Sequence, residues 1–384
     1  MSDRGEPRGR VPPEPIPLTV LTGFLGAGKT TLLNKLLRDP ALKDTAVIIN
    51  EFGEVGLDHL LVEYVDDNVM LLQSGCLCCT MRGDLVDALE TLLRDLDNNR
   101  CTFKRLVLET TGLADPAPVL HTAMMHPYLV MRYRLDGVVT LVDAVNGEAT
   151  LDAHVEAVKQ AAVADRLVLT KTDLADPATI DSLKARLHAL NPAAPILDAA
   201  RGEATPANLL GCGLYDPNSK IPDVSKWLRD EAYADSHDHG HEHGHHHHGH
   251  DDHGHRDRNR HDDHIRSFVL TSDEAIPEGA FHLFIDLLRS LHGPNLLRLK
   301  GIVKLAESPE RPIVIHAVQH VFHPFSQLER WPDDDRRTRI VFITRDIPES
   351  VLRETFAAFL NKPAPDRPDR AALADNPLVP FGGR

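Results

Sequence analysis

The stretch Gly23-Phe-Leu-Gly-Ala-Gly-Lys-Thr30 matches the pattern G-x-x-x-x-G-K-[ST] of a phosphate-binding loop. It directly follows an apolar run, Leu18–Leu21, and opens a segment in which leucines recur at helical spacing. A strand, a glycine-rich loop and a helix therefore come in the order that such a loop requires. This stretch predicts a nucleotide-binding α/β domain.

The expected role of each loop residue follows from its chemistry. Glycines let backbone N–H groups close around phosphate oxygens at a helix N-terminus, whose dipole favours negative charge. We expect Lys29 to neutralise the β- and γ-phosphates and the Thr30 hydroxyl to bind Mg²⁺. The predicted phosphate-binding residues are Gly23, Gly26, Ala27, Gly28, Lys29, Thr30 and Thr31.

Beyond the loop, short apolar runs alternate with amphipathic stretches as far as about residue 212. This alternation is typical of βαβ units and predicts a doubly wound, mostly parallel sheet. Asp84–Leu96, for example, has leucines at helical spacing. The expected strands are Leu18–Leu21, Ala46–Ile49, Val69–Leu72, Leu106–Leu108, Gly137–Val142 and Leu167–Leu169.

The run Leu106–Leu108 ends in Glu109 and is followed by Thr-Thr-Gly112. A carboxylate at the end of a neighbouring strand can hold Mg²⁺ directly or through water, and a glycine after it can sense the γ-phosphate. Lys29, Thr30 and Glu109 are the predicted catalytic residues, with Gly112 added to the nucleotide-binding set.

Thr170-Lys-Thr-Asp173 follows another apolar run, at the place where GTPases carry Asn-Lys-x-Asp. An aspartate accepts from guanine N1–H and the 2-amino group together, and adenine offers no such pair of donors. Thr170 stands in place of the asparagine, while Lys171 and Asp173 keep the pattern. We therefore expect Thr170, Lys171 and Asp173 to bind guanine, with adenine as the alternative.

Three thiols lie close together in Gly75-Cys76-Leu-Cys78-Cys79-Thr80. Thiolates at such spacing can converge on one ion, and sulfur favours Zn²⁺ or Cu⁺ over Mg²⁺. We predict a metal site of Cys76, Cys78 and Cys79; a redox-active thiol group and buried inert cysteines are the alternatives. Glu51 and Glu54 are weaker candidates, since an acid on an exposed loop is the commoner interpretation.

Thirteen of the 23 histidines lie between His237 and His264, with almost no apolar residue among them. This composition cannot bury a core, so we expect a disordered linker that captures Zn²⁺, Ni²⁺, Co²⁺ or Cu²⁺ with low selectivity, or a purely polar linker. We divide the chain into a disordered N-terminus (1–17), a nucleotide-binding domain (18–228), a histidine-rich linker (229–264), a small α+β domain (265–362) and a tail (363–384).

Charge and hydropathy exclude several classes of protein. The net charge is −15 and no basic cluster occurs, so nucleic acid is not an expected partner. No run approaches the length of a membrane span, and the N-terminus has prolines where a signal peptide needs apolar residues. We expect a cytoplasmic protein.

Five segments in this order, GFLGAGKTT, EFGE, GCLCC, LETTG-ADP and LTKTD, resemble the CobW-like GTPases, which are similar to nickel-insertion GTPases of urease and hydrogenase maturation. The resemblance implies GTP hydrolysis with Mg²⁺, and a chaperone that delivers zinc, or in some members cobalt, from Cys76, Cys78 and Cys79 to a client metalloprotein. It also implies a CobW-type C-terminal domain.

Three other interpretations stay open: a nickel- or cobalt-insertion GTPase, a metal buffer that relies on the histidine tract, and a small-molecule kinase that uses ATP. The sequence also leaves open the oligomeric state, a homodimer included.

Overall fold

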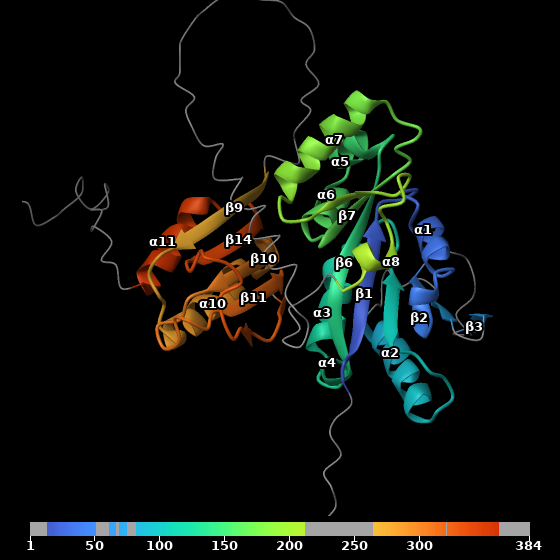
Figure 1. Ribbon diagram of the computed structural model, residues 1–384, viewed down its shortest axis with the longest axis horizontal. Helices are drawn as coiled ribbons and strands as arrows, with labels where there is room; N and C mark the ends of the chain where they lie inside the picture. Colours follow the sequence, from blue (N-terminus) through green and yellow to red (C-terminus); the bar gives the residue numbers. More distant parts are fainter. Residues whose placement is uncertain are drawn as a thin grey trace, which may run out of the picture.

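The computed structural model describes residues 14–50, 61–66, 69–74, 82–211, 264–319 and 321–360. They form two sheets with helices, which lie side by side in Figure 1. Among the described helices, none combines the length and the apolar character needed to cross a membrane.

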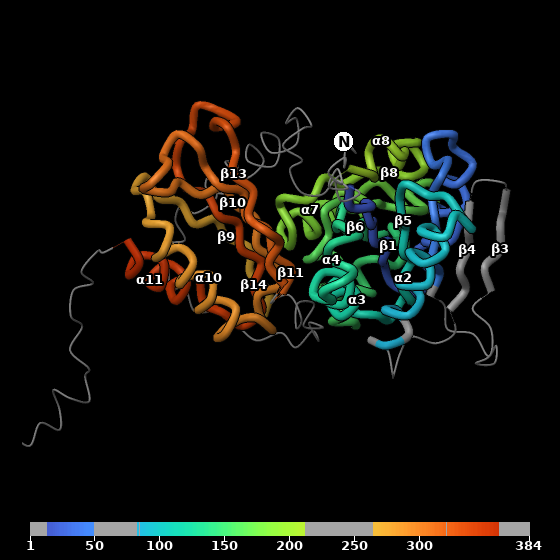
Figure 2. The backbone as a smooth tube through the Cα atoms, turned by 90° about the horizontal axis from the view of Figure 1, so that it is seen from below, coloured from blue at the N-terminus to red at the C-terminus, as the bar shows by residue number. Residues whose placement is uncertain are grey.

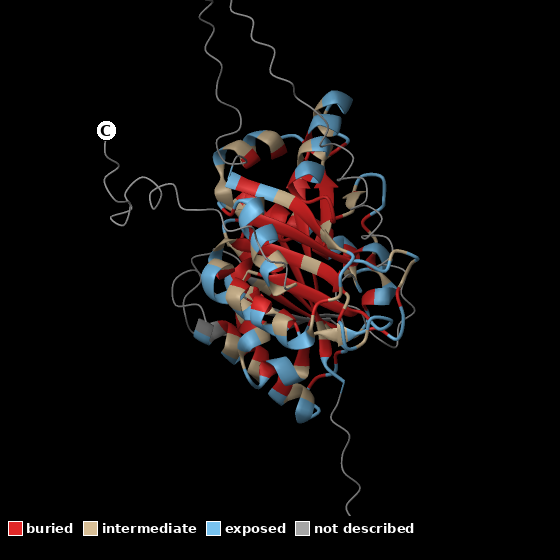
Figure 3. Ribbon diagram, turned by 90° about the vertical axis from the view of Figure 1, so that its left-hand side faces the viewer, coloured by how far each residue is buried: buried red, intermediate tan, exposed pale blue. Residues whose placement is uncertain are grey.

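The first domain is built on an eight-stranded sheet in the order β3-β4-β2-β5-β1-β6-β7-β8. Every neighbouring pair is parallel except β3 and β4, so the predicted doubly wound, mostly parallel sheet is confirmed. The central strands are buried on both faces (Figure 3), as their nearly continuous apolar runs require. The strands are β1 (Ile16–Gly23), β2 (Thr45–Asn50), β3 (Leu61–Asp66), β4 (Val69–Ser74), β5 (Arg105–Glu109), β6 (Tyr133–Asp143), β7 (Arg166–Thr170) and β8 (Ile196–Asp198).

Helices lie on both faces of this sheet (Figure 1). Two of them begin at an aspartate that caps the helix and is followed by proline: Asp115 accepts from Ala117 N, and Asp176 accepts from Thr179 N. The helices are α1 (Lys29–Leu36), α2 (Arg82–Asp97), α3 (Pro116–Met125), α4 (Leu129–Arg132), α5 (Gly147–Ala153), α6 (Val155–Ala162), α7 (Pro177–Leu190) and α8 (Pro206–Leu209).

The second domain has an antiparallel sheet in the order β12-β11-β10-β14-β9, with β13 paired to β11. Helices α10 and α11 cover one face, where Phe284 meets Phe356 edge-on at 5.2 Å between ring centroids. The elements are β9 (Ile265–Ser272), α10 (Glu278–His292), β10 (Leu296–Val303), β11 (Ile313–Val318), β12 (Val321–Phe322), β13 (Ser326–Gln327), β14 (Thr338–Arg345) and α11 (Glu349–Phe359).

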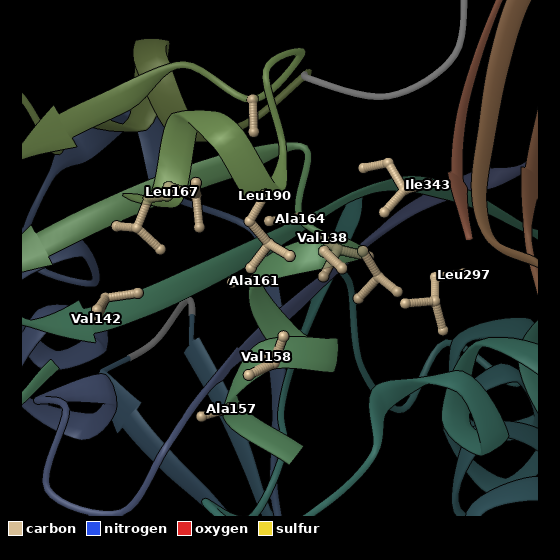
Figure 4. Close-up of a cluster of buried hydrophobic side chains, with 14 of the residues drawn as sticks. Val138, Val142, Ala157, Val158, Ala161, Ala164, Leu167, Leu190, Leu297 and Ile343 are labelled. Atoms are coloured by element: carbon tan, nitrogen blue, oxygen red, sulfur yellow. The ribbon is translucent and has the colours of Figure 1, made fainter. Parts of the chain in front are cut away.

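The other face of this second sheet packs on the first domain (Figure 2). Leu297 and Ile343 belong to the same buried cluster as Val138, Ala161 and Ala164 (Figure 4). An aliphatic contact of this kind removes apolar surface of both domains from water. The two domains therefore share a core at their boundary.

Several elements differ from the sequence-based expectation. β1 begins at Ile16, inside the stretch expected to be disordered, because Ile16 and Pro17 pair with β6. β3 and β8 were not among the expected strands. β8 is only three residues long, and β3 is antiparallel at the sheet edge, so neither has the long apolar run of a central strand.

Candidate nucleotide site

The phosphate-binding loop joins β1 to α1 at the carboxyl edge of the sheet, where β1 lies between β5 and β6. Gly28 caps α1 with a φ of 88°, a left-handed conformation that glycine adopts without strain. Lys29 is buried, and its Nζ donates to the carbonyls of Gly23 at 2.9 Å and Phe24 at 3.2 Å. Lys29 thus stabilises the conformation of the loop of which it is itself a part.

A cavity of about 380 Å³ opens beside this loop. It brings together most of the predicted phosphate and Mg²⁺ residues, although they lie far apart in the chain. Thr30 Oγ1 donates to Glu109 Oε1 at 2.9 Å. The lining residues are Leu25, Gly26, Gly28, Lys29, Thr30, Thr31, Glu109, Thr110, Thr111 and Gly112.

Gly112 lies against the backbone of the phosphate-binding loop. A Cβ atom added to it would stand 2.6 Å from Leu25 N and 2.8 Å from Leu25 Cα. Every other amino acid would push the loop aside, so this close approach requires glycine. The turn after β5 therefore packs directly on the phosphate-binding loop, and the two together form one continuous surface.

The segment Thr170–Asp173 follows β7, next to β6 in the same sheet. Thr170 Oγ1 donates to Ala27 O of the phosphate-binding loop at 2.8 Å. The hydroxyl thus gives the segment a direct tie to the loop. Asp173 is exposed, as a carboxylate must be if it is to meet a ligand from solution.

Lys171 has a left-handed φ of 58° and is paired with Asp143 at the end of β6. The distance from Lys171 Nζ to Asp143 Oδ2 is 2.6 Å. Burial disfavours the charged carboxylate of Asp143, but hydrogen bonds from Lys171 and Asn146 outweigh burial and lower its pKa. The pair fixes the lysine stem beside the loop.

The loop after β8 was missed in the sequence and lies next to Thr170–Asp173. Asp198 Oδ1 accepts from Thr172 Oγ1 at 2.7 Å, and from the backbone N–H groups of Ala200 at 2.9 Å and Arg201 at 3.2 Å. Burial opposes the charge on Asp198, yet these hydrogen bonds lower its pKa. The only sequence signal was an aspartate that ends a short apolar run.

The predicted metal ligands Cys76, Cys78 and Cys79 lie outside the described residues, as do Glu51 and Glu54. So does the histidine tract up to residue 263. Within the part of the chain that the structure describes, no group of three or more histidine, cysteine or acidic side chains is placed to hold a metal ion.

Comparisons with known proteins agree with this architecture. Residues 17–198 match the model of the CobW/HypB/UreG nucleotide-binding domain, and residues 265–360 match that of the cobalamin synthesis protein cobW C-terminal domain.

Two curated relatives align with this chain over nearly their whole length. The zinc chaperone YjiA of Escherichia coli is 34% identical over 344 residues, which cover 89% of this chain and 98% of YjiA. The zinc chaperone CobW of a Sinorhizobium species is 30% identical over 90% of this chain and 97% of its own length. The crystal structure of Zn(II)-bound YjiA GTPase matches with a TM-score of 0.62 at 29% identity, over 90% of this chain and 99% of YjiA.

Proposed function

Because this chain belongs to the CobW/HypB/UreG family of nucleotide-binding proteins, we propose that it is a cytoplasmic GTP-hydrolysing metal chaperone, most suited to zinc, that passes its ion to a client metalloprotein. One observation carries the proposal more than any other. Thr30 and Glu109 meet at 2.9 Å inside the cavity that the phosphate-binding loop lines. That is the arrangement that GTP hydrolysis with a divalent cation needs.

The residues of this cavity fit Mg²⁺. A hydroxyl and a carboxylate are hard oxygen ligands, and Mg²⁺ prefers one or two such ligands together with phosphate oxygens. Thr30 and Glu109 would hold the ion, which supplies positive charge beside the β- and γ-phosphates when bound. Lys29 and the loop N–H groups surround the same phosphates and stabilise the charge that develops on them.

Thr170, Lys171 and Asp173 would bind the base, with Asp173 accepting from guanine N1–H and the 2-amino group. The loop after β8 lies beside this segment, because Asp198 accepts from Thr172 as well as from the backbone of Ala200 and Arg201. The hydrogen bond between Thr172 and Asp198 connects the two loops. A base bound between these loops would therefore meet donors and acceptors in fixed positions. We propose guanine as the base on these grounds.

We propose Cys76, Cys78 and Cys79 as the metal-binding residues. Thiolates favour soft and borderline ions, and the relatives named above are zinc chaperones. A cytosolic location keeps such thiols reduced and able to bind metal. Insertion of nickel or cobalt into a metalloenzyme is the alternative function, since the same family model includes HypB and UreG.

Nucleotide hydrolysis by the purified full chain tests the proposal. We expect turnover of GTP but little of ATP, and we expect Lys29→Ala to abolish it. Lys35→Ala is the matched control, because Lys35 is an exposed lysine of the same helix α1. Preferential turnover of ATP would favour the kinase alternative, and full activity of a folded Lys29→Ala variant would overturn the nucleotide assignment.

A further inference from the structure

Helix α6 is tied to the turn after β5 by a single buried side chain. Gln160 is 1% exposed. Its Nε2 donates to Ala114 O at 2.9 Å and to Gly112 O at 3.2 Å. One carboxamide thus uses both of its N–H donors on two carbonyls of the same turn.

The helix that carries Gln160 is itself fixed at several points. Thr140 Oγ1 on β6 donates to the backbone carbonyl of Gln160 at 2.7 Å. Lys159 Nζ pairs with Asp115 Oδ2 at 3.0 Å, just beyond the same turn. At its N-terminal end His154 stacks on Phe24 of the phosphate-binding loop, with 4.4 Å between ring centroids. Gln160 therefore reaches the turn from a rigid support.

On its other side, the turn held by Gln160 packs against the phosphate-binding loop. Gly112 lines the phosphate cavity and packs against Leu25 so closely that a Cβ atom would not fit. A shift of this turn would move the Gly112 N–H relative to the γ-phosphate of a bound nucleotide. The position of a hydrogen-bond donor matters for catalysis, because a misplaced donor loses most of its effect on the charge that develops in the transition state.

We propose that Gln160 is a positioning residue for GTP turnover: its two hydrogen bonds to Gly112 and Ala114 hold the turn in register with the γ-phosphate. This inference rests on the proposed function. Gln160 is not among the residues that line the cavity of Thr30 and Glu109, whereas Gly112 is, so Gln160 acts on that cavity through the turn. GDP lacks the γ-phosphate, so its phosphates would meet the phosphate-binding loop and not the turn at Gly112. The effect of Gln160 therefore falls on GTP and not on GDP.

The test compares Gln160→Met with Thr140→Val in the full chain. Methionine keeps the length and most of the volume of glutamine but has no donors, whereas Thr140→Val removes a hydrogen bond to the same helix without touching the turn. The dissociation constants of GDP and of a non-hydrolysable GTP analogue are measured together with kcat. For Gln160→Met we expect unchanged GDP affinity, analogue affinity weakened roughly 5- to 150-fold, as is usual for coupled sites, and a lower kcat. Thr140→Val is expected to keep the ratio of the two affinities, because the Lys159–Asp115 pair and the stacking of His154 on Phe24 still hold the helix and both hydrogen bonds of the Gln160 side chain remain.

The outcomes separate the inference from the proposed function. If the wild-type chain does not hydrolyse GTP, the proposed function fails. If the wild-type chain turns over and Gln160→Met keeps both its affinity ratio and its kcat, the positioning role is wrong. Equal weakening of GDP and analogue would also overturn it, since a merely structural side chain has that effect. Should Gln160→Met not fold, the same comparison is made with Gln160→Leu, which also has no donor.

Discussion

Lys300 Nζ of the C-terminal domain donates to the carboxylate of Asp165 in the nucleotide-binding domain at 2.6 Å, and the Asp165 side chain is completely buried. Arg298 pairs with the same carboxylate and also donates to Val163 O. Burial opposes ionisation of Asp165, but the two cations hold its pKa well below its usual range. The buried ion pairs of Asp165 with Arg298 and Lys300 therefore join the two domains, next to the aliphatic contact at their boundary.

Asp165→Asn is expected to destabilise the protein by about 3–5 kcal/mol, because it leaves Arg298 and Lys300 buried without their counter-charge. Asparagine keeps an acceptor for the Val138 N–H, which bonds to Asp165 Oδ2 at 2.9 Å, so the change isolates the charge. Urea unfolding of both proteins measures the difference. Glu310→Gln is the control, since its pair with Arg336 is exposed and contributes about 1 kcal/mol or less. A similar loss in the free energy of unfolding of both variants would show that burial does not increase the contribution of the Asp165 ion pairs to stability.

The stability of this boundary is expected to depend on pH. His316 and His323 stack at 4.6 Å between ring centroids and are buried beside Asp165, Arg298 and Lys300. Burial and the two cations outweigh Asp165, lowering the pKa of His323 to about 3 and that of His316 well below its usual 6.5. Both imidazoles are thus neutral in the folded protein at pH values where the unfolded chain binds protons.

Acid therefore favours the unfolded state. The stability that depends on these two neutral histidines is complete above about pH 6.5. Below that pH the free energy of unfolding falls by about 1.4 kcal/mol per pH unit for each buried histidine. We expect His323→Phe, which keeps a ring but cannot titrate, to reduce the slope of unfolding free energy against pH between 6 and 4 by about that amount. His188→Gln, on the exposed side of α7, is expected to leave the slope nearly as it is. An unchanged slope in His323→Phe would mean that the histidine is protonated in the folded protein.

Asp173→Asn is expected to move nucleotide preference from GTP towards xanthosine triphosphate. An amide can donate to the 2-oxo group of xanthine, whereas the carboxylate can only accept. Competition binding with both nucleotides measures the change, with Asp181→Asn, an exposed acid on α7, as the control. If the preference of Asp173→Asn matches that of the wild type, another segment reads the base.

Cys78→Ser is expected to remove any dependence of metal affinity on the nucleotide. In the wild type we expect GTP to tighten zinc binding relative to GDP by roughly 5- to 150-fold, since the cysteines lie in the chain between the phosphate-binding loop and Glu109. A serine hydroxyl stays protonated near neutral pH and is a poor ligand for zinc. Chelator competition in both nucleotide states gives the affinities. Equal affinities in the wild type would indicate a passive metal store.

The sequence predicted those parts of the site that one local segment determines. The phosphate-binding loop, Glu109 and Thr170–Asp173 each follow a buried apolar strand, whose pattern is visible without a structure. Gln160 gave no such signal, because its partners Gly112 and Ala114 lie 46–48 positions away. Nor did Asp165 and Lys300, which are 135 residues apart. Contacts of this kind depend on how the elements pack, which periodicity does not encode.

Strand β7 begins directly after Asp165 and ends at Thr170, so it spans only five residues, or about 16 Å. The ion pair between the domains and the proposed base-binding segment thus lie at the two ends of one short strand, which is paired to β6 and β8. A displacement of the C-terminal domain, which holds Asp165 through Arg298 and Lys300, would therefore act at one end of the strand whose other end is Thr170.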